Sequence, residues 1–442
     1  MSNMSIQNNH KILLINLTLA LIPVSFILGN LILNLNIIIL ISLTLLFYGL
    51  AIFGINLNII DKLVILFFLY IIFNGIFNNF FNFKFANAPS NLVVFKSMSY
   101  LRFLFLYFVI RFLIDKDFLN YKIIFLTFGL CSLFVSIDVI IQYSFGKDIF
   151  GHPKALRRLS GPFGDEAIAG SFIQRFFIFI PFAILFFIEE NKKILIQILF
   201  TLTLIISCFG LFLAGNRIPL LLFVLMLPMI TVYEKNFRKT LLVSIIISIL
   251  GSAYIMNNSI QTKFHYNTFV TKSSELLNYL KHRVTTGEIK GKNNYIKEFE
   301  TGILTWEKNV NFGGGIKSFR WNCSTIDREK LLDFVTHEGG VNCNNHPHNY
   351  YIEIASELGR VGLIIISLII ILIMFDSIKK LHFSKISNEK KMFLVPFFIV
   401  LTLEFFPLRT SGSFFSTINA NYIFIILPFL VGLLNYKKKF NE

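Results

Sequence analysis

Residues 346–375 read HPHNYYIEIASELGRVGLIIISLIIILIMF, a polar beginning that leads into a long apolar run. As a helix, the run from Tyr350 to Phe375 is long enough to cross a hydrocarbon core of about 30 Å. Its first turns nevertheless hold glutamate and arginine, directly after two histidines, and such groups are costly to bury in a membrane. The stretch therefore predicts a membrane-spanning helix with a cluster of ionisable groups at one end.

Apolar runs of similar length recur along the chain of 442 residues, which is 55% hydrophobic and only 15% charged. We therefore predict an all-α polytopic membrane protein, since a β-barrel would show short alternating segments instead. The first run has no small-residue cleavage site and leads at once into another, so we expect it to be retained as a helix. The predicted transmembrane helices number about twelve and lie at 11–28, 31–53, 60–81, 93–114, 122–145, 167–188, 194–214, 217–233, 240–257, 350–375, 392–407 and 415–434.

The net charge of +16 comes largely from basic residues between the apolar runs, which favours a lipid bilayer rather than a nucleic acid as the partner. Lys and Arg accumulate in cytoplasmic loops of membrane proteins. A cytoplasmic N-terminus places all the strongly basic short loops inside, at 115–122, 189–193, 234–239 and 376–391. The same orientation places 146–166, 258–349 and the turn at 407–410 outside. We predict a multi-pass protein of the bacterial inner membrane with these segments facing the periplasm.

The pattern divides the chain into four parts. Residues 1–145 are N-terminal transmembrane helices, 146–257 are central helices with a basic outer loop, 258–349 form a large periplasmic loop domain, and 350–442 are C-terminal transmembrane helices. The loop of 258–349 is too long for an ordinary connection. It contains His265, His282, His337, His346 and His348, together with Cys323 and Cys343. An oxidising periplasm permits a disulfide between these cysteines, and two free thiols are the alternative.

Several arginines break the expectation that outer loops avoid positive charge. Arg158, Arg217 and Arg409 lie at outer turns, whereas Arg102 and Arg175 lie inside apolar runs. A charge at mid-span costs about 2.5–3.5 kcal/mol on insertion scales, so such side chains usually face a cavity or a partner. Snorkelling to lipid phosphates is the alternative near a helix end. Because guanidinium groups bind phosphate oxygens bidentately, these arginines predict an anionic, lipid-linked pyrophosphate as substrate.

The histidine segment admits three interpretations. Asn349 is a plausible helix cap, and Glu353 and Glu357 share one face of the helix that follows. A metal site would use His346, His348 and Glu353, although neither HExxH nor paired CxxC is present. A structural role would leave His348 at the helix mouth without chemistry. A general base would use the His348 imidazole, which titrates near neutral pH, to accept a hydroxyl proton. Gly359 and Gly362 are expected to let a second helix approach closely.

Five motifs in order along residues 140–365 resemble the O-antigen ligase and polymerase superfamily. His348 to Gly362 fits the family pattern H-N-x9-G-x-x-G, and Arg158 to Phe163 resembles R-x-[ST]-G-x-F. Leu211 to Arg217 is similar to its L-T-G-S-R turn. The stretches 142–151 and 306–316 are also similar to the family. Asp165-Glu166 departs from the frequent Asn-Pro-Asn, so we assign these two residues no role.

The resemblance implies a glycosyltransferase that takes a glycan from undecaprenyl diphosphate at the periplasmic face, without a metal or other cofactor and with inversion at the anomeric carbon. Carried over by motif, His348 is the catalytic base and Arg217 contacts the diphosphate. Topology adds Arg158, Arg409 and Arg102 as weaker diphosphate contacts, and His346, Asn349 and Glu353 as supporting residues.

The acceptor stays open. The resemblance implies either a sugar of the lipid A core, as in O-antigen ligases, or a second lipid-linked glycan, as in polymerases; we favour the ligase. A lipid-linked sugar transporter is a more distant alternative, because it also explains many spans and cationic cavities. The absence of a visible inverted repeat argues against a transporter.

Overall fold

A computed structural model describes residues 2–80, 91–155, 158–189, 191–286, 294–325, 343–409 and 412–435. Regular structure in these ranges is helical, and no strand is assigned in them. Among the described residues, nine helices are long and apolar enough to cross a membrane, and the bent pair α8–α9 makes a tenth. The chain is therefore an all-α polytopic membrane protein, as predicted from the sequence.

The predicted number of twelve spans is not confirmed. All of the predicted runs coincide with helices, but two of the helices have only 17 residues, α11 (Arg217–Tyr233) and α18 (Asn388–Glu404). Both contain a proline, Pro228 and Pro396. Their length falls at the lower limit of what a bilayer needs.

The elements follow one another as short and long helices with brief connections. The first part of the chain forms α1 (Ser2–Ala20), α2 (Ile22–Ile27), α3 (Asn30–Tyr48), η1 (Gly49–Phe53), α4 (Ile59–Phe80), α5 (Leu92–Tyr100), α6 (Arg102–Asp115) and α7 (Tyr121–Phe145). The middle part forms η2 (Gly161–Phe163), α8 (Ala169–Phe176), α9 (Phe179–Phe187), α10 (Lys193–Ala214), α11, η3 (Lys235–Phe237) and α12 (Arg238–Asn258). The last part forms α13 (Ile260–Thr286), α14 (Asn294–Glu307), α15 (Phe319–Asn322), η4 (Cys323–Thr325), α17 (Tyr350–Ile378), η5 (Lys379–Phe383), α18 and α19 (Thr417–Asn435).

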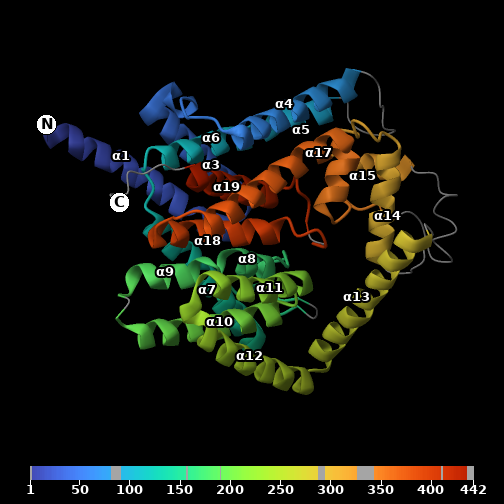
Figure 1. Ribbon diagram of the computed structural model, residues 1–442. Helices are drawn as coiled ribbons and strands as arrows, with labels where there is room; N and C mark the ends of the chain where they lie inside the picture. The colour runs from blue at the N-terminus through green and yellow to red at the C-terminus, as the bar shows by residue number, and fades with distance from the viewer. Residues whose placement is uncertain are drawn as a thin grey trace.

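Helix α19 forms the centre of the bundle and packs against α6 and α18 (Figure 1). Its apolar window is 89% buried within the protein, far more than that of any other long helix in the described residues. Aromatic rings fill the contact; Phe103 of α6, for example, stacks on Phe424 of α19 with ring centroids 5.7 Å apart. Because α19 is held on all sides, the loop that precedes it, with Arg409 and Ser413, has a fixed place at one end of the bundle.

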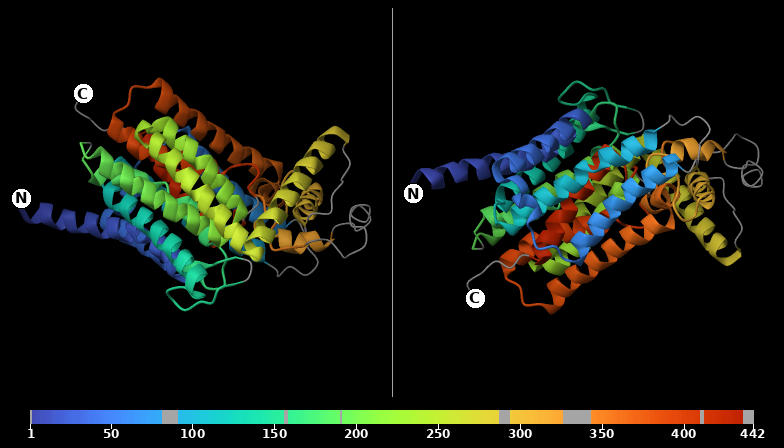
Figure 2. Two further views of the ribbon diagram at one scale, coloured as in Figure 1. Left: turned by 90° about the horizontal axis from the view of Figure 1, so that it is seen from below. Right: turned by 90° about the horizontal axis from the view of Figure 1, so that it is seen from above.

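Helices α13, α14 and α15 extend beyond one end of the bundle, and the chain begins at the opposite end (Figures 1 and 2). We call residues 258–349 the polar segment. Its described helices turn back so that α14 packs against the beginning of α17. The polar segment therefore covers the end of the bundle at which the histidines and Arg409 lie.

The beginning of α17 is shaped by a glycine with a backbone that other residues rarely adopt. Gly359 has φ 66° and ψ −171° inside the helix, which breaks the regular hydrogen bonding there. The loop at 310–315 uses the break: Arg360 N donates to the Val310 carbonyl (2.8 Å), and Gly315 N donates to the Glu357 carbonyl (2.7 Å). The expectation that a second helix approaches Gly359 is therefore wrong, because the segment that approaches is this loop.

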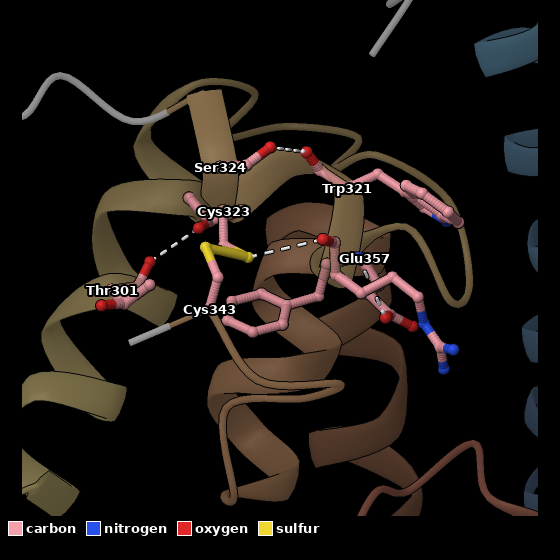
Figure 3. The surroundings of a disulfide bond; sticks show 9 residues. Thr301, Trp321, Cys323, Ser324, Cys343 and Glu357 are labelled. Carbon is pink, nitrogen blue, oxygen red and sulfur yellow. Dashed lines mark hydrogen bonds between the residues drawn. A yellow bond between two sulfur atoms is a disulfide. The ribbon is translucent and has the colours of Figure 1, made fainter. Parts of the chain in front are cut away.

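A disulfide joins Cys323, at the end of α15, to Cys343, three residues before His346 (Figure 3). Cys323 is fully buried. In Figure 3 the bond lies between Thr301 of α14 and Glu357 of α17. The alternative left open by the sequence is thus resolved in favour of the bond, which ties the histidine segment to the body of the polar segment.

Candidate functional site

The turn His346–Asn349 is held by backbone and side-chain hydrogen bonds rather than by regular structure. His348 has a left-handed backbone with φ 53°, and its N–H donates to Nδ1 of His346 (3.2 Å). The Asn349 side chain accepts from the N–H groups of Tyr351 (3.0 Å) and Ile352 (3.2 Å), as expected for a helix cap. The same side chain donates to the Pro407 carbonyl (2.9 Å). Asn349 therefore fixes the histidine turn both to α17 and to the loop that contains Arg409.

Both imidazoles are half-buried and favour the neutral form. Burial lowers the pKa of His348, and the nearby Arg158 lowers it further. Burial, together with His348, Lys317 and Arg320, lowers the pKa of His346 to about 3. At neutral pH each ring therefore has a nitrogen lone pair available to accept a proton or a hydrogen bond.

The histidines line a cavity of about 650 Å³ between the polar segment and the end of the bundle. Six cationic side chains and a single carboxylate, Glu298, line it among the described residues. The cations come from separate parts of the chain and are Arg158, Arg175, Arg217, Lys317, Arg320 and Arg409. Such a cavity attracts a polyanion, because low-dielectric walls focus the field of charges of one sign.

Two of these arginines share one buried carboxylate. Arg175 Nη2 lies 2.6 Å from Glu404 Oε1, and Arg409 Nη1 lies 2.8 Å from Glu404 Oε2. Tyr350 also donates to Glu404 Oε1 (2.8 Å), and Arg175 donates to Asn419 (2.7 Å). All three charged residues are buried. Because the cluster contains two guanidinium groups and only one carboxylate, these three side chains together carry a net positive charge beside the cavity.

Arg158 and Arg217 line a second cavity of about 240 Å³ as well as the first. Aromatic side chains form part of its wall, and Phe212 stacks on Tyr266 with centroids 4.7 Å apart. Asn216 positions the start of α11, since it accepts from Gly170 N (3.2 Å) and donates to the Ala167 carbonyl (2.9 Å). The two arginines therefore stand on the wall between a polar and a more aromatic compartment.

The carboxylates of α17 hold loops in place. Glu353 accepts from Phe414 N (2.6 Å) and from the Ser413 hydroxyl. Glu357 accepts from Lys317 N (2.7 Å) and more weakly from Phe319 N (3.4 Å). Through these bonds α17 positions the cavity residues Lys317 and Ser413. The ammonium group of Lys317 in turn donates to the Ser413 hydroxyl oxygen (2.8 Å). Glu353 itself is not among the residues that line the cavity, and its hydrogen bonds hold the 413–414 loop.

The metal hypothesis required Glu353 to converge with both histidines. In the part of the chain that the structure describes, no three His, Cys, Asp or Glu side chains are grouped to hold a metal ion. Glu353 instead directs its carboxylate at the 413–414 loop.

The structure brings together most of the residues proposed from the sequence. Arg158, Arg217, Arg409, His346 and His348 all line the cavity. Arg102 is the exception, because it donates to the Ser99 carbonyl (3.2 Å) and lies over Phe103, away from the cavity lining. The expected contact of Arg102 with a diphosphate is therefore not supported. His337 lies outside the described residues, and so does Thr410 in the turn of Arg409.

Sequence reasoning missed Glu298, Lys317, Arg320 and Glu404. Glu298 and Lys317 belong to no motif that we recognised. Glu404 did leave a signal, since it is the one acidic residue at the end of an otherwise apolar run and lies five residues before Arg409. A buried charge of that kind usually has a partner of opposite sign.

A family model described as O-Antigen ligase matches residues 202–367, which include α11, the polar segment and the histidine turn. A comparison with the curated proteins found no match. The match covers three of the five motifs, including the pattern from His348 to Gly362, and this family includes both O-antigen ligases and polymerases. The match supports a relationship of this chain to the O-antigen ligase superfamily, whose members are glycosyltransferase-like enzymes.

Proposed function

We propose that the protein is an O-antigen ligase, which transfers a glycan from undecaprenyl diphosphate to a sugar of the lipid A core at the periplasmic face of the inner membrane. The supporting observation is the cavity that His348 lines together with arginines from five other parts of the chain. A lipid-linked glycan needs this combination, because its diphosphate is an anion and its transfer releases a proton.

His348 acts on the nucleophile. Because its pKa is lowered, the imidazole is neutral at neutral pH and accepts the proton of the acceptor hydroxyl. The hydroxyl oxygen attacks the anomeric carbon, the new carbon–oxygen bond forms, and the bond to the diphosphate breaks on the opposite side. A single displacement of this kind inverts the anomeric carbon.

Arg158 and Arg217 act on the leaving group. The electron pair of the broken bond stays on the diphosphate, whose growing negative charge is stabilised by fixed guanidinium groups. The Arg175–Glu404–Arg409 cluster adds positive charge to the wall of the same cavity. We infer that these fixed cations replace the divalent ion that many other glycosyltransferases use, so that transfer is metal-independent.

The two cavities suggest how such a donor is accommodated. Arg158 and Arg217 belong to both, so a diphosphate between them has the polar cavity on one side and the aromatic-lined cavity on the other. The glycan and the acceptor fit the polar cavity, and the lipid side of the donor fits the aromatic one. Positive residues of the short loops at the opposite end of the bundle support a periplasmic place for both cavities.

The test supplies purified protein in detergent with a defined undecaprenyl diphosphate glycan and both acceptors, lipid A core and a second lipid-linked glycan. An O-antigen ligase yields glycosylated lipid A core. Elongated lipid-linked glycan identifies a polymerase of the same superfamily instead. Unchanged donor with both acceptors present contradicts the proposal and favours a transporter.

A further inference from the structure

Glu298 of α14 stands out because it is a carboxylate in a cavity suited to anions. Its side chain is 9% exposed, and Oε1 lies 3.8 Å from Nε2 of His348. The Asn344 side chain donates to the same oxygen (2.7 Å), which fixes the carboxylate toward the histidine turn. A negative charge here opposes the binding of a diphosphate, so Glu298 is expected to have a role other than binding the donor.

The other buried carboxylates near the cavity stabilise the local structure. Glu404 is bonded to two arginines, whereas Glu353 and Glu357 accept hydrogen bonds from backbone N–H groups. Glu298 differs from them because it lines the cavity itself and faces the imidazole expected to act as base.

We propose that Glu298 is a catalytic residue, which together with His348 binds the acceptor hydroxyl and takes up its proton. This inference rests on the proposed glycosyl transfer. The separation of 3.8 Å between Nε2 and Oε1 exceeds a hydrogen bond. One hydroxyl oxygen can nevertheless sit within hydrogen-bond distance of both atoms at once, at the apex of a triangle. The hydroxyl is thereby oriented as well as deprotonated.

The proton balance favours Glu298 as the final holder. When the acceptor oxygen bonds to the anomeric carbon, its O–H bond breaks and the proton enters the His348–Glu298 pair. An imidazolium at His348 is disfavoured by burial and by the nearby Arg158, which together lower the pKa of this imidazole. Burial raises the pKa of Glu298 to about 7, so this carboxylate accepts a proton near neutral pH. The pair then returns the proton to solvent.

The surroundings of the pair contain several other charges. The titratable and charged groups that line the same cavity are Arg158 from the loop after α7, Arg175 of α8, Arg217 of α11, Lys317 and Arg320 near α15, His346 of the histidine turn, and Arg409 of the loop before α19. On α17, which packs against α14, Glu353 and Glu357 are bonded to loops and Arg360 is bonded to Asn311. Except for His346, which is neutral near pH 7, the cavity-lining groups in this set are arginine and lysine cations. The change of activity near pH 7 should therefore follow Glu298 and His348.

The experiment compares wild-type protein with Glu298→Gln in the detergent transfer assay, across pH 5 to 9. Glu298→Gln should lower kcat on the order of 10²-fold, as expected for loss of a general base, while the KM for donor stays the same or falls. Wild-type kcat should fall below about pH 7, where Glu298 becomes protonated. In the variant this limb should move to lower pH, because only His348, with its lowered pKa, remains to titrate.

A structural role for Glu298 predicts a different result. Wild-type kcat in Glu298→Gln, or a reduced kcat with the acidic limb unmoved, would overturn the inference. Glu298→Asp keeps the charge with a shorter side chain, and it should retain more activity than the glutamine variant and keep the limb near pH 7. Glu300→Gln, which removes another buried carboxylate of α14 away from the cavity lining, is the matched control and should transfer at the wild-type rate.

The experiment separates this inference from the proposed function. If wild-type protein transfers glycan and Glu298→Gln does so equally well, only the role of Glu298 fails. If wild-type protein transfers no glycan to either acceptor, the proposed function fails and the role of Glu298 fails with it.

Discussion

In the proposed transfer, Arg217 stabilises charge on the diphosphate and His348 accepts a proton, and both residues line the same cavity. Arg217 begins α11 and is positioned by Asn216, which is bonded to the loop at 167–170. His348 is positioned by a left-handed backbone and by its neighbour Asn349, which caps α17. In each case the functional side chain stands at the start of a helix, and an adjacent asparagine fixes that start.

Arg217→Ala is expected to weaken use of the lipid-linked donor. Loss of a charge-assisted, bidentate phosphate contact costs about 1.5–3 kcal/mol, which corresponds to an increase of roughly 10- to 100-fold in the donor KM. The KM of the acceptor should change little. Transfer kinetics with each substrate varied in turn measure both values.

Arg102→Ala is the matched control for Arg217. Arg102 is also an arginine near an apolar run, but it lies over Phe103 and contacts Ser99. Its removal should leave the donor KM unchanged. An equal rise in donor KM for both variants would contradict the assignment of Arg217 to the diphosphate.

At the scale of elements, α17 connects the cavity to the polar segment. Its first turns hold the histidine turn through Asn349, the 413–414 loop through Glu353, and the 313–319 loop through Glu357. The break at Gly359 lets the 310–315 loop join this helix by backbone hydrogen bonds. The glycines of the family pattern H-N-x9-G-x-x-G are thus explained in part by the left-handed backbone at Gly359 and the loop packed on it.

Gly359→Ala should destabilise the protein more than an ordinary glycine replacement. A Cβ here meets backbone atoms of Asn311 and Phe312 and also suffers the penalty of φ 66°. The backbone at φ 66° and ψ −171° lies in a region that is essentially restricted to glycine, and this alone costs about 1–3 kcal/mol. Gly146→Ala is the control, since Gly146 has φ 80° but nothing within 4 Å of an added Cβ. Thermal unfolding in detergent should show a larger loss for Gly359→Ala; equal losses would contradict the close packing at Gly359.

The disulfide attaches the histidine turn to the polar segment, in addition to the hydrogen bonds that Asn349 makes. Cys323 and Cys343 are 20 residues apart. By reducing the conformational entropy of the unfolded chain, a disulfide across a loop of this length stabilises the folded protein by about 3 kcal/mol. Cys323→Ser with Cys343→Ser should lower the unfolding temperature and the transfer rate, because the segment before His346 loses its attachment. Reductant should produce the same changes in wild-type protein and none in the double variant. An unfolding temperature insensitive to both would contradict the bond.

At the scale of the whole molecule, the amino-acid sequence predicted the class of fold and the apolar runs that form its long helices. Long apolar runs and the positions of Lys and Arg are direct consequences of membrane physics, so they could be recognised in a single sequence. The number of spans was less certain, since α11 and α18 are shorter than a typical span and the α8–α9 pair is bent by 41°.

The composition of the cavity could be predicted only in part. Arg158, Arg217 and His348 belong to motifs, and Arg409 lies at a short turn between apolar runs. These four residues could therefore be identified from the sequence. Glu298 lies in an amphipathic helix of the polar segment, where an acidic residue is ordinary. Its position opposite His348 depends on how α14 folds back onto α17, which no local pattern reveals. Arg102 was wrongly included because a charge near an apolar run does not say which way its helix faces.

The central claim is that His348 abstracts the acceptor proton in a cavity whose arginines hold a diphosphate. The most direct measurement is glycan transfer by purified His348→Ala from a defined undecaprenyl diphosphate donor, beside wild-type protein in the same detergent. We predict a loss of transfer on the order of 10²- to 10⁴-fold with donor binding retained, because the base is removed and the arginines remain. Transfer by the variant at the wild-type rate would contradict the account.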